Sequence, residues 1–273
     1  MSSQIISFTH WLDTAAGQQL RDWECCHFDE CVSDIFGYHA LQLGLGALPA
    51  LRSNRMPHQW LALTAAEQAG LAAAPSAAPV RAALLAHPAA LPFPENSLDL
   101  VVLPHTLELS EDPHGTLREV ERVLVPEGKL VITGLNPASL WGFRQQRGHW
   151  ARRLGVGRLF LPEEGEFIGY WRLRDWLRLL SFEVESARFG CYRPALESSR
   201  WLERFAWMDQ AGARWWPIFG AAYFVVAIKR VRGLRLLEPA WKVRPKRVAA
   251  PAVATRRQAR GAAGEGGGST GPG

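Results

Sequence analysis

The run from Leu91 to Pro137 constrains the fold of this chain more than any other feature, because its pattern reads strand, loop, helix, turn and strand. Leu98 to Pro104 and Lys129 to Thr133 are nearly continuous apolar runs, as expected of strands that helices cover on both faces. Two strands joined through a helix form a βαβ unit, whose strands pair in parallel. The run therefore predicts an α/β sheet of the doubly wound kind.

The helix between these two strands carries its own start and stop signals. Asp112 is suited to cap a helix whose first residue is Pro113. Apolar residues recur at helical spacing on the face that should meet the sheet, namely Leu117, Val120 and Leu124. Pro126-Glu127-Gly128 then predicts the turn that ends the helix and starts the next strand.

The same run resembles the second half of the catalytic domain of type-11 class I S-adenosylmethionine-dependent methyltransferases, the relatives of the quinone-biosynthesis methyltransferases. That family reads LPF-D-SFD-V, then LEH-DP, then EV-RVLKPGG-L-I. This chain matches it at Leu91 to Phe93, Ser97, Asp99, Leu107, Glu108, Asp112, Pro113, Glu119 to Leu124, Pro126, Gly128 and Leu130. The segments LPHTLE and GLNPASLWGFR are also similar to a small bacterial branch of the family. The resemblance covers about residues 30 to 190.

The resemblance implies a Rossmann-like doubly wound sheet of seven strands, mostly parallel with an antiparallel last strand, and S-adenosyl-L-methionine as the cofactor. We expect a helical preface at residues 1–36, a methyltransferase-like domain at 37–240 with acceptor-side insertions in 137–220, and a basic, Gly/Ala-rich disordered tail at 241–273. The remaining strands are expected at Ala40–Leu43, Gln59–Thr64, Arg81–Leu85, Phe182–Phe189 and Ala222–Val231. Further helical segments are expected at Ser139–Leu154 and Leu173–Leu180.

A glycine pair follows the first expected strand and predicts the cofactor site. Gly44 and Gly46 resemble the family's G-x-G, where the missing side chains let the backbone approach a ligand. A bare G-x-G also forms simple turns, so its position after an apolar strand carries the interpretation. The resemblance places the cofactor against Gln42, Gly44, Leu45, Gly46, Thr64, His87, Pro88, Leu103 and Pro104.

This site departs from the family pattern in its first half. The family usually carries an acidic residue where Gln42 stands and a third glycine where Leu48 stands. It also places a ribose-binding carboxylate after the second strand, where Thr64 is followed by two alanines and Glu67 is the first acid. His87-Pro88 occupies the place of an Asp-Ala pair. Loss of a carboxylate that binds a ribose diol weakens cofactor binding, because such charged hydrogen bonds are strong.

His105 is the best-placed titratable group for accepting a proton, because it follows the strand that ends at Pro104 and its ordinary pKa lies near neutrality. The alternative is a histidine that hydrogen bonds to backbone at a strand end. Glu108 matches a family position, and we interpret it as a partner of a helix end or of backbone rather than as a base.

Composition limits the partners. The net charge of +5 belongs to the tail, because residues 241–273 hold seven Lys or Arg against one Glu, which leaves −1 for the rest of the chain. Nucleic acid is therefore expected to bind only through the tail. The chain has no run of 18 apolar residues and no secretory leader, which favours a cytoplasmic protein without a membrane span. The four cysteines form no CxxC pair, so no metal site is expected.

Tryptophans gather after the matched run, at positions 141, 150, 171, 176, 201, 207, 215 and 216. They are compatible with an apolar acceptor site, with peripheral contact with a membrane, or with ordinary packing, which we favour for any single tryptophan. Arg144, Arg147, Arg152 and Arg153 are compatible with an anionic acceptor or with a solvated helix face.

The leading hypothesis is a methyltransferase that uses S-adenosylmethionine to methylate a small-molecule acceptor. A catalytically degenerate protein of the same fold, acting in binding or as a scaffold, is the alternative that Gln42 and the missing ribose carboxylate favour. An RNA methyltransferase recruited by the basic tail is a further alternative. A dinucleotide-dependent reductase fits less well, because the third glycine is absent and no acid ends the second strand.

Overall fold

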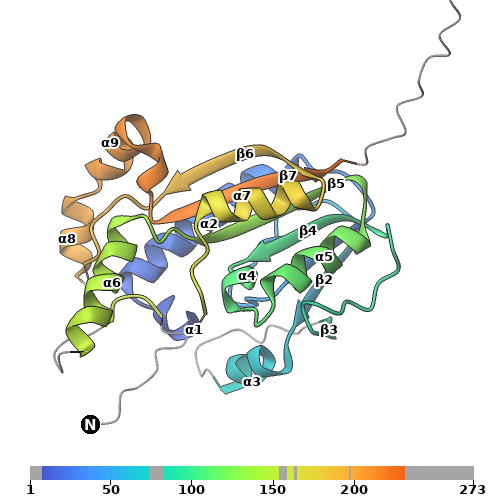
Figure 1. The fold of residues 1–273 in the computed structure, drawn as a ribbon, viewed down its shortest axis with the longest axis horizontal. Coiled ribbons are helices and arrows are strands. Elements are labelled where there is room, and N and C mark those ends of the chain that lie inside the picture. Colours follow the sequence, from blue (N-terminus) through green and yellow to red (C-terminus); the bar gives the residue numbers. More distant parts are fainter. Residues whose placement is uncertain (1–7, 74–82, 154–158, 163–164, 197, 231–273) are drawn as a thin grey trace, which may run out of the picture. The chain divides into compact units, whose positions relative to one another are not determined.

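The computed structural model describes residues 8–73, 83–153, 159–162, 165–196 and 198–230, so the predicted tail and the first seven residues lie outside the described part. Seven strands form one sheet in the order β3-β2-β1-β4-β5-β7-β6 (Figure 1). The strands are β1 (His39–Leu43), β2 (His58–Leu63), β3 (Leu84–Leu85), β4 (Leu98–Pro104), β5 (Leu124–Leu135), β6 (Phe182–Gly190) and β7 (Ala222–Lys229).

The first four described helices are α1 (Phe8–Trp11), α2 (Ala15–Ser33), α3 (Ala65–Ala73) and α4 (Thr106–Leu109). The others are α5 (Pro113–Val123), α6 (Leu140–Arg153), α7 (Tyr170–Leu179), α8 (Ser199–Arg204), α9 (Trp207–Trp215) and the short 3₁₀ turn η1 (Pro217–Phe219).

The pairing confirms the predicted fold class. Strands β1 to β5 pair in parallel, and β7 lies antiparallel between β5 and β6. The chain thus runs from β5 through α6 and α7 to the outer strand β6, and returns to insert β7 next to β5. The long connection between β6 and β7 contains α8, α9 and η1.

The βαβ unit forms as its sequence pattern predicts. Strand β4 has the predicted bounds, and Asp112 caps α5 by accepting a hydrogen bond from the Gly115 amide at 2.8 Å. Strand β5 is longer than predicted, because Leu124 already pairs with Leu98 before the register shifts. The predicted turn at residues 126–128 is an irregularity inside β5, with Glu127 in the left-handed region at φ 63°.

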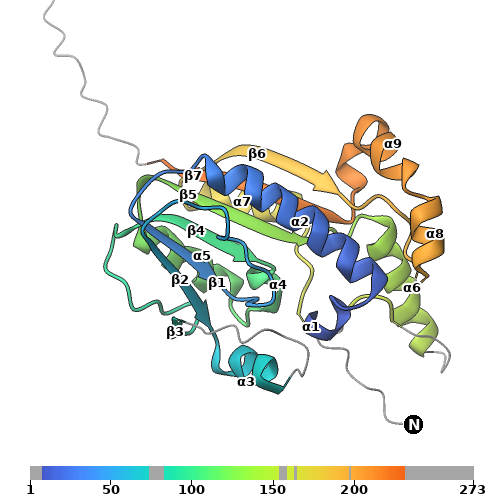
Figure 2. The same ribbon diagram turned by 180° about the vertical axis from the view of Figure 1, so that it is seen from behind.

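Helices α5 and α7 cover one face of the sheet, and α2 crosses the other (Figures 1 and 2). The buried row of α2 repeats every fourth residue, as Leu20, Glu24, Phe28 and Val32. Trp23 and Cys31 lie beside this row and are only partly buried. Phe36 lies beyond the end of the helix at Ser33, and its side chain is 76% exposed.

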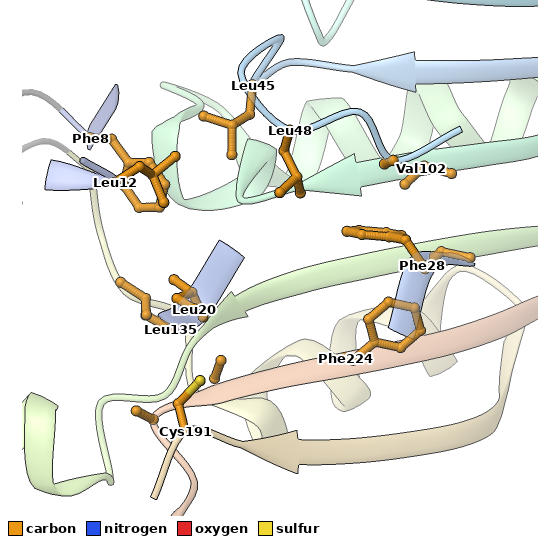
Figure 3. Packing of buried hydrophobic residues seen from close by; sticks show 14 of the residues in the cluster. Phe8, Leu12, Leu20, Phe28, Leu45, Leu48, Val102, Leu135, Cys191 and Phe224 are labelled. Carbon is orange, nitrogen blue, oxygen red and sulfur yellow. The ribbon is translucent and has the colours of Figure 1, made fainter. Parts of the chain in front are cut away.

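The connection between β1 and β2 has turns in place of a helix. Leu45 and Leu48 from this segment enter the same apolar cluster as Val102 of β4, as Figure 3 shows. The Asn54 side chain anchors the segment to the end of α2 by donating to the Val32 carbonyl at 2.8 Å. Helix α2 therefore covers a face that the β1–β2 connection leaves without a helix of its own.

Phe28→Ala tests this role of α2. The Phe28 ring is fully buried and meets Phe224 of β7 with 5.0 Å between centroids, so its removal leaves a cavity (Figure 3). We expect a loss of about 3–5 kcal/mol in the free energy of unfolding, measured by urea denaturation. Phe36→Ala is the matched control and should change stability by less than about 0.5 kcal/mol. Equal effects of the two substitutions would contradict this packing.

Candidate functional site

The glycine loop after β1 requires an unusual backbone at two successive residues. Gly44 has φ 80° and Leu45 has φ 39°, so both lie in the left-handed region. A Cβ atom at Gly44 would lie 3.0 Å from Thr106 Oγ1 and 3.2 Å from Glu67 Oε1. Glycine is therefore required here both by backbone conformation and by the close approach of two polar side chains.

Gln42 holds this loop in shape. Its buried amide nitrogen donates to the carbonyl oxygens of Gly44, Leu45 and Leu48 at 3.3, 3.2 and 2.7 Å, and its carbonyl oxygen accepts from the Ala50 amide at 3.0 Å. A carboxylate can only accept hydrogen bonds, so an acidic residue at this position could not satisfy three carbonyl groups. A glutamine is thus suited to a loop that turns three carbonyl groups toward it. Gln42 influences a bound ligand only through the shape of the loop that it holds.

Glu67 supplies a carboxylate to the loop that the sequence interpretation left out of the site. Its Oε2 accepts from the Thr64 amide and hydroxyl at 2.9 Å each, and the Glu67 amide donates back to the Thr64 hydroxyl at 3.2 Å. This is a capping box at the start of α3, and Thr-x-x-Glu is its sequence signal. The other oxygen, Oε1, accepts from the Leu45 amide at 3.1 Å, which brings a carboxylate from the end of β2 to the glycine loop.

A cavity of about 570 Å³ lies between this loop and α2. It is lined by Arg21, Asp22, Cys25, Cys26, Asp29, Ala47, Pro49 and Arg52. Its size suits a small ligand. Arg21 Nε is buried without a hydrogen-bond partner, while Nη2 of the same guanidinium lies 3.5 Å from Asp13 Oδ1. Among the described residues, no group of three or more His, Cys, Asp or Glu is arranged to hold a metal ion.

The carboxyl ends of β4 and β5 carry a buried cluster of one histidine and two carboxylates. His105 Nε2 lies 2.8 Å from Glu24 Oε1 of α2, and Nδ1 lies 2.8 Å from Glu108 Oε2. Glu108 Oε1 accepts from the Leu135 amide at 2.6 Å, which links the cluster to the end of β5. The Phe8 ring covers His105 with 4.6 Å between ring centroids. Helix α1 thus closes the cluster from the outside.

This environment keeps His105 protonated. Burial by itself lowers the pKa of His105, but the carboxylates of Glu24 and Glu108 outweigh burial and raise that pKa from 6.5 to about 10. Burial raises the pKa of Glu108 as well, against the opposing influence of His105. Since the pKa of His105 lies above neutrality, this side chain carries a proton on each ring nitrogen at neutral pH and can donate one hydrogen bond to each carboxylate. Glu24 Oε2 is buried without a hydrogen-bond partner, and it is the open acceptor atom of the cluster.

The sequence interpretation of His105 as a strand-end histidine bound to backbone is incomplete, because both of its ring nitrogens contact carboxylates. Glu108 does contact backbone, as expected, but it also binds His105. Glu24 was missed, since nothing in the sequence distinguishes a buried carboxylate among the apolar residues of α2. Its spacing of four from Leu20 and Phe28 is the only local signal.

The structure brings together only part of the cofactor site that the sequence predicts. Gln42, Gly44 to Gly46 and Thr64 meet around the loop, and Glu67 and Thr106 join them. Thr106 also donates its hydroxyl to the Leu43 carbonyl, which ties β1 to β4. Leu103 and Pro104 end β4 next to β1, with the Leu103 side chain in the core under α5 and α7. Pro88 is buried, and His87 is exposed and bridges to Ala90.

These residues fit the chemical groups of S-adenosylmethionine. The Glu67 carboxylate at the end of β2 is of the kind that binds ribose hydroxyls, and the glycine loop beside it admits a close backbone approach. The unpartnered Arg21 Nε fits a carboxylate such as that of the methionine moiety. Glu67 and Thr106 already approach Gly44 closely, so binding there requires their side chains to turn.

Comparison with known proteins agrees with this geometry. Residues 44–132 match the sequence model of the family described as Methyltransferase domain. The protein YafS of Escherichia coli K12 is 33% identical over 177 residues, which cover 64% of this chain and 62% of YafS. The chain thus spans less than two thirds of the length of that relative.

Solved structures show the same fold. A chain of the complex between the Haloferax volcanii Trm112 methyltransferase activator and a methyltransferase superposes with a TM-score of 0.53 at 17% identity, over 82% of this chain and 98% of that chain. A SAM-dependent methyltransferase of Thermotoga maritima superposes with a TM-score of 0.51 at 14% identity, over 78% of this chain and 92% of that chain.

Residues 44–132 thus match a methyltransferase domain, in agreement with the resemblance seen in the sequence, and the solved structures share its fold. S-adenosyl-L-methionine is the cofactor that this domain implies, which agrees with the expectation from sequence.

The protonation of His105 can be tested by NMR titration of its imidazole. Its folded pKa is raised, so the stability that the cluster contributes is fully present below about pH 6.5 and is lost as the pH rises through about 10. We expect the His105 ring signal to stay at its imidazolium position from pH 6 to 8.5, about one unit or more below the raised pKa. A His105 midpoint near 6.5 would contradict the cluster as described.

Proposed function

We propose that this chain is a type-11 class I methyltransferase that uses S-adenosylmethionine and methylates a small acceptor beside His105. The observation that carries the proposal is the buried Glu24–His105–Glu108 cluster at the carboxyl ends of β4 and β5. In open α/β sheets this edge is where ligands bind.

The cluster is costly if it serves only to hold the fold together. Removing ions from water costs several kcal/mol per ion, and well-packed apolar side chains often fill the same space at lower free energy. The other buried side chains between α2 and the sheet are apolar, such as Leu20 and Phe28, and the Glu30–Arg188 ion pair with β6 is exposed. An ionic cluster at the ligand edge, adjoining the glycine loop through Thr106, therefore favours a chemical role.

The chain's own residues account for binding and for the movement of one proton. When bound, S-adenosylmethionine supplies a methyl group made electrophilic by its sulfonium. The glycine loop and Glu67 would hold the nucleoside, and Arg21 would hold the carboxylate. His105 is already protonated, so it orients Glu24 rather than accepting a proton itself. Glu24 Oε2 then accepts the proton that the acceptor loses, once the Phe8 ring no longer covers the cluster.

A degenerate binding or scaffold protein remains the second candidate, and one observation favours it. Glu67 and Thr106 occupy the space in front of Gly44, and Gln42 holds the loop from behind. If these side chains keep that space filled, the chain retains its fold but catalyses no methyl transfer. The RNA methyltransferase alternative rests on the basic tail, which lies outside the described residues.

Calorimetric titration with S-adenosylhomocysteine, which lacks the transferable methyl group, separates these candidates. We expect saturable binding by the wild-type chain and binding weakened about tenfold or more by Arg21→Met, because a hydrogen bond between charged groups is lost. Arg178→Met on α7, an exposed arginine outside this cavity, is the matched control and should bind like wild type.

The scaffold alternative predicts neither heat nor a rise in melting temperature at millimolar ligand. Equal affinity in Arg21→Met and wild type would instead place the methionine end of the cofactor outside the cavity beside α2.

A further inference from the structure

An unusual number of large apolar side chains are exposed at the end of the molecule where the sheet carries α6, α8 and α9. Helices α6, α8 and α9 gather at this end in both views (Figures 1 and 2). We call its exposed apolar side chains the tryptophan surface, and they are Leu140, Phe143, Trp150, Trp201, Trp207, Trp215, Trp216, Ile218 and Phe219. Trp215 is 74% exposed, and every residue from Ala213 to Phe219 is exposed.

Packing explains only part of the tryptophan cluster that the sequence shows. Trp141 is buried and Trp176 is partly buried, so the favoured interpretation holds for those two. It is wrong for Trp150, Trp201, Trp207, Trp215 and Trp216, which are exposed in the tryptophan surface, and for Trp171 on α7. Isolated apolar residues on a surface need no explanation, but a gathering of this size marks an interaction site.

The tryptophan surface is fixed to the domain by polar contacts. The Trp141 indole donates to the Arg193 carbonyl at 2.8 Å, which ties α6 to the segment before α8. Arg193 pairs with Asp209 of α9 at 2.7 Å. The Asn136 amide nitrogen donates to the carbonyls of Ile218 and Gly220 at 2.7 and 3.0 Å, and so ties η1 to the end of β5. The apolar side chains are thus presented by an anchored scaffold.

Positive charge accompanies these apolar side chains. Helices α6, α8 and α9 contain seven arginines, one glutamate and one aspartate, a net charge of +5, and α6 has no acidic residue. The other residues of 1–240 contain 17 Lys or Arg and 23 Asp or Glu, a net charge of −6. The basic charge of the folded part is therefore concentrated where the exposed tryptophans are. An anionic surface complements it.

The composition fits a lipid headgroup region better than a protein groove. Tryptophan is enriched at membrane interfaces, where its apolar ring and polar N–H are both satisfied. Arginines lie against the exposed rings, with the Arg204 guanidinium 5.7 Å from the Trp201 ring centre and that of Arg147 5.9 Å from Phe143. The apolar side chains come from three helices and a 3₁₀ turn. A fluid bilayer can adapt its shape to side chains presented by such different elements.

We propose that the tryptophan surface and the arginines of α6, α8 and α9 bind the surface of membranes rich in anionic phospholipid. The contact is peripheral, since none of the helices described here is long and apolar enough to cross a bilayer. Aromatic side chains enter the interface and arginines pair with lipid phosphates. The proposal does not depend on the enzymatic activity of the chain.

Co-sedimentation of the full chain with vesicles tests this surface. Vesicles of phosphatidylcholine with phosphatidylglycerol are compared with vesicles of phosphatidylcholine alone at physiological salt. We expect the wild-type chain to bind the anionic vesicles, and Trp215→Ser/Trp216→Ser to bind them about tenfold more weakly. Trp171→Ser removes a tryptophan of similar exposure from α7, outside this surface, and should bind like wild type.

Charge reversal provides a second, independent variant. Arg200→Glu/Arg214→Glu keeps every tryptophan and should weaken binding to anionic vesicles by about tenfold or more. Because the basic tail can itself attract anionic lipid, unchanged vesicle binding by both double variants would assign binding to the tail and overturn the proposal. Loss of a dimer in Trp215→Ser/Trp216→Ser, with vesicle binding unchanged, would show that a second copy covers this surface and would also overturn it.

Discussion

The contact of Glu24 with His105, whose ring also binds Glu108, is the interaction on which the ligand end of this protein depends. It joins α2 to the end of β4 through His105 and to the end of β5 through Glu108. The β1–β2 connection provides no helix for this face of the sheet, so α2 must cover it. An ionic cluster at that contact fixes the register of α2, because a shift would leave a buried charge without its partner.

The position of α2 in turn defines the cavity beside the glycine loop. Arg21 and Cys25 lie one turn apart on α2 and face Ala47 and Pro49 of the loop. Two further side chains hold the loop by hydrogen bonds. Gln42 of β1 donates to the Leu48 carbonyl, and Glu67 of α3 accepts from the Leu45 amide. Gln42 and the lack of a helix between β1 and β2 are therefore parts of one arrangement. In it, α2 covers the face of the sheet that the β1–β2 connection leaves uncovered.

Local signals account for what the sequence could predict. The bounds of β4, the Asp112 cap and the apolar stripe of α5 depend on neighbours within a few residues. The first two are confirmed, as are Leu117 and Val120 of the stripe, whereas Leu124 begins β5. Glu24 could not be found in this way, because its partner His105 is 81 residues away. Glu67 carries a recognisable capping box, but its second contact with Leu45 depends on how β1 and β2 pair.

The sequence pattern also cannot predict which tryptophan side chains are exposed. Tryptophan is large and apolar, so packing was the natural expectation for Trp215 and Trp216. Both lie where α9 ends and η1 begins, next to Pro217, and the chain there runs along the outside of the fold. Only the three-dimensional arrangement shows that α9 contacts β6 and η1 on one side and leaves these indoles uncovered on the other.

We propose that the glycine loop, the start of α3 and α2 together hold S-adenosylmethionine. Hydrogen–deuterium exchange with and without S-adenosylhomocysteine tests it most directly. The account predicts slower exchange on ligand addition in peptides that cover residues 42–48, 64–67 and 21–25, with no change in β6. Unchanged exchange in all three segments at saturating ligand, or protection confined to other parts of the chain, would contradict it.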